Sequence, residues 1–269
     1  MKKKLIACIA LFITFLSSSL LFAHEFWIMP SKFRLQPDEF FTLNFYVGED
    51  FNGELWAKRR ERTARFTHFS KRRQEDLTAL AIKSDSGDVV LKFNTVGTHL
   101  LSFESKNSFI GLDAAKFNNY LKEDGIDNIY DLRKKTGTLT KNSRELYRRC
   151  VKTLVQVGDK TDKIYGRTIG TTLEVVPLKN PYDLKLGDEM SVQILYEGKP
   201  LTDKLVVVWN KSQGVKTRHQ QYRTDKKGKI RFPLDKKGDW MVSLVQMIPI
   251  SDNAKADYQS LWGDLTFGF

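Results

Sequence analysis

The sequence predicts a mainly β fold of two Ig-like β-sandwich domains, with a small helical insertion in the first domain. Short segments in which apolar and polar residues alternate, as in half-buried strands, occur in residues 40–104 and again in residues 190–269. Between them, residues 112–157 change to the three-to-four-residue apolar spacing that is typical of helices.

The first 23 residues have the parts of an export signal. Three lysines precede the apolar segment 5–15, a triple serine interrupts the apolar character, and Ala23 provides a small residue for cleavage. We therefore expect export to the periplasm and a mature chain that begins at His24. The alternative is an uncleaved anchor helix, because the stretch is about long enough to span a bilayer. After cleavage, no segment approaches membrane-spanning length, which predicts a soluble protein of the cell envelope.

Charge and cysteine content narrow the class of protein. The whole chain carries a formal net charge of +12, but most basic clusters stand beside acidic residues. This pattern favours a solvated surface, and with export it argues against a nucleic-acid partner. Cys150 is the one cysteine that remains after cleavage, so no intramolecular disulfide is expected. Its apolar neighbours indicate a buried thiol rather than a nucleophile.

The first predicted domain, residues 24–165, begins with strands. Alternation predicts strands at residues 42–47, 89–93 and 101–103. The charge-rich stretch 52–75 predicts a long surface excursion between them.

Three helices are expected in the insertion, residues 112–157. Asp113 is a suitable N-cap for a helix that ends at Gly125, and Asp127 is suitable for a second, shorter one. Asn142 and Glu145 resemble a capping box for a third. Its apolar stripe would comprise Leu146, Tyr147, Cys150, Val151, Leu154 and Val155.

The polar stretch 158–163 breaks the helical pattern and marks the expected domain boundary. The second domain, residues 166–269, is predicted to be all β. Its expected strands lie at 190–194, 205–209, 230–234, 240–244 and 265–269.

Sequence blocks of the second domain resemble Ig-like modules of the Cna-B and transthyretin-like type. In that type, a Gly-x-Pro-Leu hairpin precedes a central strand, and Thr-Asp-x-x-Gly turns the chain into the next. The matching residues here are 198–201, 206–208, 224–232 and 238–242. The resemblance implies a β-sandwich for this domain.

The chain from residue 24 onward also resembles the DUF4198 family. The matching blocks are 24–27 (His-Glu-Phe-Trp), 47–49 (Val-Gly-Glu), 117–125, 144–148 with Lys152, 184–188 and 261–267. This family comprises exported bacterial proteins described as periplasmic components of nickel or cobalt uptake, so the resemblance implies a membrane transporter as partner. Where the family often has a histidine followed by methionine, this chain has Gln246 before Met247. If that histidine holds a metal, this chain lacks one ligand.

An amino-terminal His24 would supply two nitrogen ligands, its α-amine and imidazole Nδ1, to a divalent transition metal. Nickel and cobalt are the first candidates, with copper and zinc as others. The candidate partners are His68, with Glu25 and Glu49 as oxygen ligands. No Cys-x-x-Cys or His-x-x-x-His pair occurs.

Catalysis is not expected, since the chain has no Gly-x-Ser-x-Gly, P-loop or dinucleotide-binding glycine pattern. The alternative to metal capture is a non-catalytic binding module for carbohydrate or protein partners of the envelope. Trp56, beside the charged excursion, is the candidate sugar-stacking residue. Trp209, Trp240 and Trp262 fall on strand patterns and are expected in the core.

Overall fold

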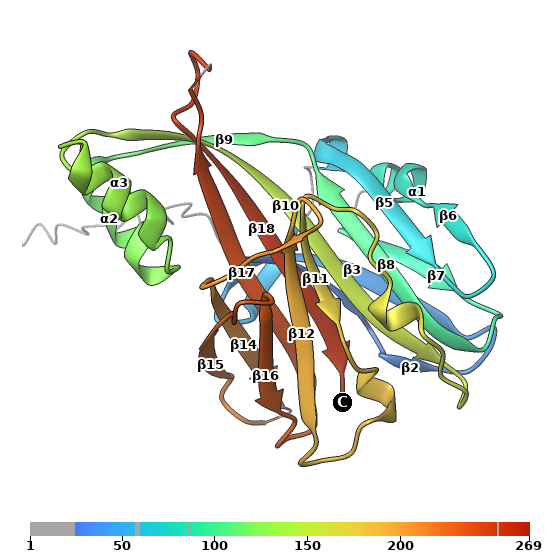
Figure 1. Cartoon of the computed structure of the whole chain (residues 1–269). Coiled ribbons are helices and arrows are strands. Elements are labelled where there is room, and N and C mark those ends of the chain that lie inside the picture. Colours follow the sequence, from blue (N-terminus) through green and yellow to red (C-terminus); the bar gives the residue numbers. More distant parts are fainter. Residues whose placement is uncertain (1–24, 57–59, 85–86, 213, 252) are drawn as a thin grey trace, which may run out of the picture.

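The structure is a computed structural model that describes residues 25–56, 60–84, 87–212, 214–251 and 253–269. It confirms a mainly β fold with few helices (Figure 1). The residues of the expected signal segment, 1–23, and His24 lie outside the described part. The strands are β1 (Glu25–Pro30), β2 (Arg34–Leu35), β3 (Phe40–Glu49), β4 (Asn52–Leu55), β5 (Thr63–Phe69), β6 (Gln74–Asp76), β7 (Asp88–Lys92), β8 (Gly97–Ser105), β9 (Ser108–Leu112), β10 (Ser143–Val157), β11 (Leu173–Pro177), β12 (Glu189–Tyr196), β13 (Lys199–Pro200), β14 (Leu205–Lys211), β15 (Arg218–Arg223), β16 (Lys229–Pro233), β17 (Asp239–Pro249) and β18 (Tyr258–Gly268).

The helices are short. They are α1 (Thr78–Lys83), α2 (Ala114–Glu123) and α3 (Asp127–Lys135), with 3₁₀ turns η1 (Arg60–Arg62), η2 (Ile164–Gly166) and η3 (Pro181–Asp183). Asp113 caps α2 as expected, because its side chain accepts a hydrogen bond from the Lys116 backbone N–H. In the ranges that the structure describes, no helix is long and apolar enough to cross a membrane.

A ten-stranded sheet forms the centre of the molecule. Its main path is β15-β14-β17-β18-β10-β8-β5-β6, and β2 and β9 pair with β10 beside that path. The pairing of β10 with β18 is parallel, whereas β17 and β18 are antiparallel. The predicted domains, 24–165 and 166–269, therefore contribute strands to one continuous sheet.

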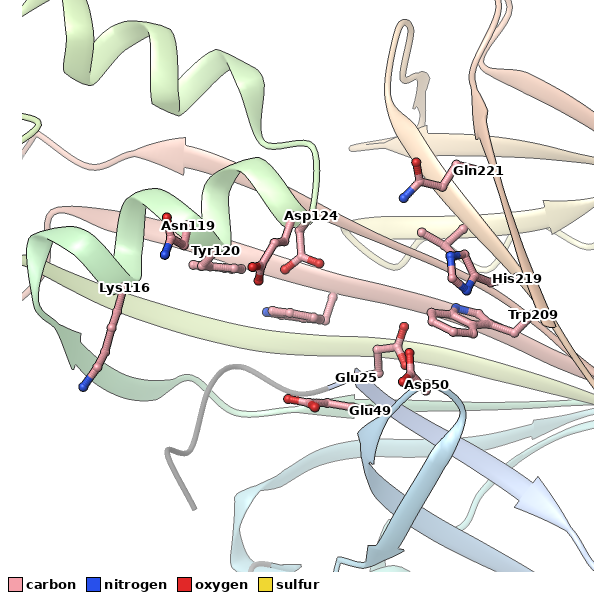
Figure 2. A pocket seen from close by; sticks show the side chains of 13 residues that line it. Glu25, Glu49, Asp50, Lys116, Asn119, Tyr120, Asp124, Trp209, His219 and Gln221 are labelled. Carbon is pink, nitrogen blue, oxygen red and sulfur yellow. The ribbon is translucent and has the colours of Figure 1, made fainter. Parts of the chain in front are cut away.

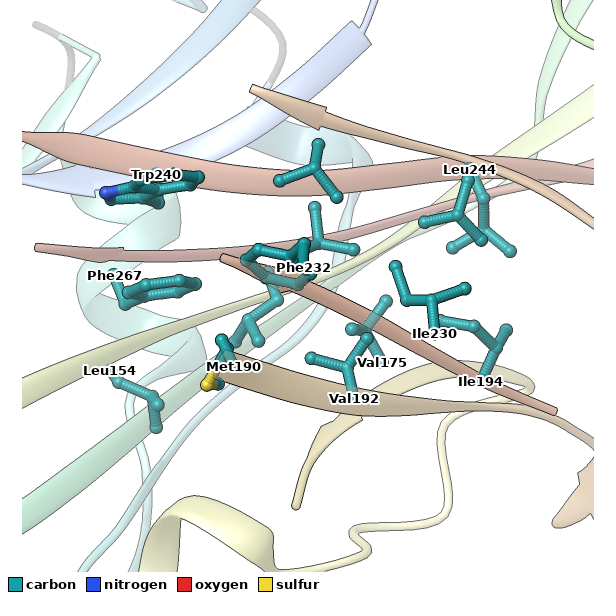
Figure 3. Packing of buried hydrophobic residues seen from close by; sticks show 14 of the residues in the cluster. Leu154, Val175, Met190, Val192, Ile194, Ile230, Phe232, Trp240, Leu244 and Phe267 are labelled. Carbon is teal, nitrogen blue, oxygen red and sulfur yellow. The ribbon is translucent and has the colours of Figure 1, made fainter. Parts of the chain in front are cut away.

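Two smaller sheets cover the opposite faces of the central sheet. The sheet of β11, β12, β13 and β16 packs on one face and closes a core that includes Val192, Ile230, Phe232 and Phe267 (Figure 3). The sheet of β1, β3, β4 and β7 packs on the other face over β5, β8 and β10. On that second face, α2 and α3 cover Tyr258 and Trp262 of β18.

The third expected helix is wrong, because its residues form β10, the longest strand. Residues 149–157 are all buried, so both faces of this strand carry core side chains. Val151 and Val155 face one core, and Cys150 and Leu154 face the other. Apolar residues on both faces of a strand produce a helix-like spacing by chance. The helical insertion is thus limited to α2 and α3.

The charged stretch 52–75 is also not the expected surface excursion. It contains β4, β5 and β6, and β5 pairs with β8 inside the central sheet. Phe66 and His68 of β5 are fully buried. Among the described charged residues of this stretch, Arg65 and residues 71–73 are exposed, and they obscure the apolar positions in the sequence.

Cys150 is 2% exposed, and burial raises the pKa of its thiol to about 11. We expect native protein at pH 8 to react with a thiol reagent about a hundredfold more slowly than an exposed cysteine, since so little thiolate is present. Absorbance after addition of Ellman's reagent measures this, and protein unfolded in guanidinium is the control that should release one thiol per mature chain. Fast labelling of the native protein would contradict the buried position.

Candidate functional site

A cleft of about 480 Å³ opens on the face of the central sheet that carries α2 and β1 (Figure 2). Its walls come from β1, the β3–β4 turn, α2, the paired strands β14 and β15, and β18. The lining residues are Glu25, Glu49, Asp50, Lys116, Asn119, Tyr120, Glu123, Asp124, Val207, Trp209, His219, Gln221 and Trp262. Five of these are carboxylates and one is a lysine, so the cleft is strongly acidic although the chain as a whole is basic.

The β3–β4 turn places Glu49 and Asp50 at the cleft. Glu49 pairs with Asn52, which leaves Asp50 and Phe51 as a two-residue hairpin loop. Both have a positive φ, 54° and 57°, as a type I′ turn requires. Phe51 is an unusual residue for this conformation. Its ring is buried in edge contact with Trp27, 5.5 Å between centroids, and this packing offsets the backbone strain.

The end of α2 places Asp124 in the same cleft. Gly125 follows with φ of 59°, the left-handed conformation that often ends a helix. A Cβ at this position would lie 2.5 Å from Leu205, so glycine also allows α2 to approach β14 closely. A carboxylate at a helix C-terminus is electrostatically unfavourable. Its presence here suggests a role other than helix stability.

Glu25 is held by a chain of hydrogen bonds from the floor of the cleft. The indole Nε1 of Trp209 donates to Ser243 Oγ at 2.9 Å, and Ser243 Oγ donates to Glu25 Oε1 at 3.4 Å. Glu25 Oε2 is buried and has no hydrogen-bond partner among the described residues. An acceptor in this condition needs a donor from elsewhere.

The carboxyl groups of the cleft act on one another. Burial, followed by the charges of Asp124 and Asp50, raises the pKa of Glu25 to about 8, and the nearby backbone N–H of Phe51 opposes this rise. Burial, with the charges of Glu123 and Glu49, raises the pKa of Asp124 to about 7, although Lys204 opposes the shift. Burial is the first cause of both shifts, so both carboxyl groups hold a proton to a higher pH than a carboxyl group in water does.

Aromatic rings form the remaining wall. The ring of Trp209 lies 4.9 Å from that of His219 on the neighbouring strand, and the ring of Tyr120 stacks parallel to that of Trp262 at 6.1 Å. Trp262 Nε1 donates to Ser260 Oγ at 3.2 Å. Because both indole N–H groups are directed into the protein, the tryptophans present carbon atoms to the cleft.

Of the predicted metal ligands, the structure brings Glu25 and Glu49 together in this cleft. His24 lies outside the described residues and is joined to Glu25 by a peptide bond. Among the described residues, no group of three or more His, Cys, Asp or Glu side chains is arranged to hold a metal ion.

His68 does not join the predicted ligands. It is 1% exposed within the central sheet, where its ring and that of His99 both stack on Phe93, with ring centroids 4.1 and 4.5 Å from that of Phe93. Its Nε2 lies 2.7 Å from His99 Nδ1, and its Nδ1 lies 3.5 Å from Glu75 Oε2. His68 was expected near the surface because residues 52–75 were interpreted as an excursion, and its position in β5 corrects that prediction.

Trp56 also differs from its prediction. It is 4% exposed and packs edge-on against Phe26 and Phe103, with Arg149 over its ring. It offers no stacking face to a sugar. By contrast Trp209, expected simply as core, lines the cleft, and so do Asp50, Asp124 and His219, which the sequence did not single out. The expected helix end at Gly125 places Asp124 in the last turn of that helix, but no sequence signal marks Asp124 as a cleft residue.

Comparison with known proteins gives one family. A family model described as "Domain of unknown function (DUF4198)" matches residues 21–247. Among solved structures, the "D0-D1 domain of Intimin" is 12% identical, with 90% of this chain and 97% of that chain covered and a TM-score of 0.19. The three N-terminal domains of the bacteriophage RB49 highly immunogenic outer capsid protein (Hoc) are 8% identical, with coverages of 91% and 70% and a TM-score of 0.21. Scores this low carry no argument about function. No curated protein matches significantly.

Proposed function

The chain belongs to the DUF4198 family, and on that premise we propose that it captures a divalent transition metal, nickel or cobalt, in the periplasm and passes it to a membrane transporter. The observation that carries this proposal is the position of Glu25. The residue that directly follows His24 lines an acidic cleft together with Glu49, Asp50 and Asp124. Cleavage after Ala23 would therefore create a two-nitrogen chelating group on the residue next to these carboxylates.

The chemistry of the donor set suits such a cargo. The amine and imidazole of His24 supply nitrogen, and Glu25 and Glu49 supply oxygen, a mixture that nickel, cobalt, copper and zinc accept. Because the described side chains hold no complete set of ligands, His24 would be required for binding. A site completed by one terminal residue at an open cleft suits capture and release. Gln246 lies outside this set of ligands.

The C-terminal strands would serve as a Cna-B or transthyretin-like module that supports one wall of the cleft. The alternative function is a binding module for carbohydrate or protein partners. Its main support was Trp56 as an exposed stacking residue, and Trp56 is buried.

We expect protein purified from the periplasm to begin at His24 by intact mass and to bind one nickel or cobalt ion with about micromolar affinity or better. Replacement of His24 by alanine should weaken binding at least about tenfold, because it removes the imidazole half of the chelate. Isothermal titration with nickel, cobalt, copper and zinc measures both. A matched control adds one glycine before His24, which keeps the imidazole and displaces the amine. Correctly processed protein that binds no metal, or a His24→Ala variant with unchanged affinity, would contradict the proposal.

A further inference from the structure

The cleft is much larger than a metal site requires. Ligand atoms lie only about 2 Å from a bound metal ion, so a metal site needs little open space. Sites for small organic molecules, by contrast, have volumes of about 300–1,000 Å³. At about 480 Å³, the cleft falls within the second range. Val207, Trp209 and Trp262 give it an apolar wall that a metal ion would not use.

The charges of the lining residues indicate which class of small molecule the cleft would bind. Five carboxylates line the cleft, and Lys116 is the one basic side chain of the lining other than His219. Four of these carboxylates lie at two places. Glu25 and Asp124 stand at the inner end, where they also line a small adjoining cavity of about 30 Å³, and Glu49 and Asp50 stand on the β3–β4 turn. A ligand that fits both places is an organic cation with more than one positive charge.

The unpaired oxygen of Glu25 indicates which kind of organic cation the cleft would bind. Glu25 Oε2 is buried and lacks a partner among the described residues, while Ser243 keeps the other oxygen in place. A primary ammonium group offers three N–H donors to such an acceptor, whereas a quaternary ammonium offers none. The alkyl chain next to the ammonium would contact Trp209, whose indole N–H is already bonded to Ser243.

We propose that the cleft binds a small alkyl amine with two or more ammonium groups, one at Glu25 and Asp124 and another at Glu49 and Asp50. The site extends beyond the proposed metal function and does not depend on it, because no part of it requires His24.

The test uses chelator-treated, metal-free protein from the periplasm and isothermal titration at low salt. Putrescine and spermidine are the probes, and tetramethylammonium is the comparison without N–H donors. We expect one amine per chain, at least tenfold weaker binding of tetramethylammonium, and no loss of amine binding in the His24→Ala variant. Absence of amine binding, or equal binding of tetramethylammonium, would overturn the proposal, whatever the result with metals.

Variants locate the site. Glu25→Gln keeps the acceptor for Ser243 but cannot ionise when an ammonium group binds, and Asp124→Asn likewise removes the ionisable group at the end of α2. Each should weaken spermidine binding about tenfold, as expected for the loss of one charge-assisted contact of about 1.4 kcal/mol. The control is Glu189→Gln, an exposed carboxylate on β12 outside the cleft. Thermal unfolding of each variant verifies that it is folded. An equal loss in Glu189→Gln would show non-specific attraction and would overturn the proposal.

Discussion

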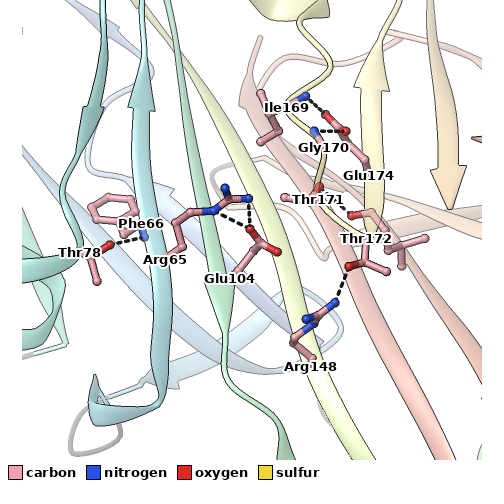
Figure 4. A network of polar contacts seen from close by, with 11 residues as sticks. Arg65, Phe66, Thr78, Glu104, Arg148, Ile169, Gly170, Thr171, Thr172 and Glu174 are labelled. Carbon is pink, nitrogen blue, oxygen red and sulfur yellow. Dashed lines mark hydrogen bonds and ion pairs between the residues drawn. The ribbon is translucent and has the colours of Figure 1, made fainter. Parts of the chain in front are cut away.

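Replacement of Lys152 by alanine is expected to lower the free energy of unfolding by about 3–5 kcal/mol, because it leaves a buried carboxylate without its cation. Lys152 of β10 and Glu174 of β11 are each 1% exposed, and Nζ lies 3.0 Å from Oε1. The pair links the central sheet to the sheet that covers it. The Glu174 carboxylate also accepts hydrogen bonds from the backbone N–H groups of Ile169 at 2.8 Å and Gly170 at 3.1 Å (Figure 4). These bonds fix Glu174 in place, so it cannot turn toward water.

Chemical denaturation at pH 7 measures this effect. The control is Arg231→Ala, which breaks an exposed pair with Glu189 at 3.9 Å and should change the free energy of unfolding little. A double variant, Lys152→Met with Glu174→Leu, should recover much of the loss, since neither charge remains buried. It should not recover all of it, because the N–H groups of Ile169 and Gly170 then lack their acceptor. A Lys152→Ala variant as stable as Arg231→Ala would show that the pair is not buried in solution.

Acid is expected to remove the stabilising contribution of His68. Burial, with the charges of His99 and Arg73, lowers the pKa of His68 to about 3, and burial lowers the pKa of His99. The neutral pair is ordered, because His99 Nε2 must donate to the Thr95 carbonyl at 2.8 Å, and His99 Nδ1 then accepts from His68 Nε2. Below pH 6.5 the unfolded chain takes up a proton that folded His68 does not, so stability falls as pH falls.

The expected loss approaches about 1.4 kcal/mol per pH unit well below pH 6.5, which amounts to about 2 kcal/mol between pH 6.5 and 4.5. His68→Phe keeps the stack on Phe93, so its stability relative to wild type should improve by that amount over this range. Buried Glu145, whose pKa is raised to about 7 by burial, acts in the opposite direction, but it is present in both proteins and cancels in the difference. Exposed His219→Gln is the control. A difference that is constant with pH would contradict a neutral buried His68.

Sequence patterns predicted the strands with one buried face. The strands expected around Thr42, Val89, Met190, Ile230 and Trp240 are confirmed. In the first four, apolar residues face a core and the residues between them are mostly less buried, so the period of two survives, whereas residues 240–245 are all buried. The prediction for β10 was wrong because this strand packs against a core on each face, which removes the alternation of apolar and polar residues. Its partner β18 is more than a hundred residues away, and no local pattern encodes a parallel pairing of that range.

The candidate site was predicted in part. The expected cleavage placed His24 next to Glu25, and Glu25 and Glu49 were predicted as oxygen ligands. Asp124, Trp209 and His219 reach the cleft through contacts between distant elements, such as the approach of Gly125 to Leu205. The sequence shows no period or motif for such a convergence. The sequence pattern around a histidine such as His68 does not distinguish a buried position from an exposed one. Its burial is therefore known only from the three-dimensional structure.

The parallel pairing of β10 with β18 constrains how the chain reaches its native state. On one side, residues 145–153 of β10 gain a partner only when residues 258–266 are present, and one side of β17 depends on the same strand. During synthesis the central sheet therefore stays open between β10 and β17 until residues 258–266 are available. Pairing between segments so distant in the sequence is slow relative to local structure formation. The pairing of β18 with β10 and β17 is therefore expected to complete the central sheet late in folding.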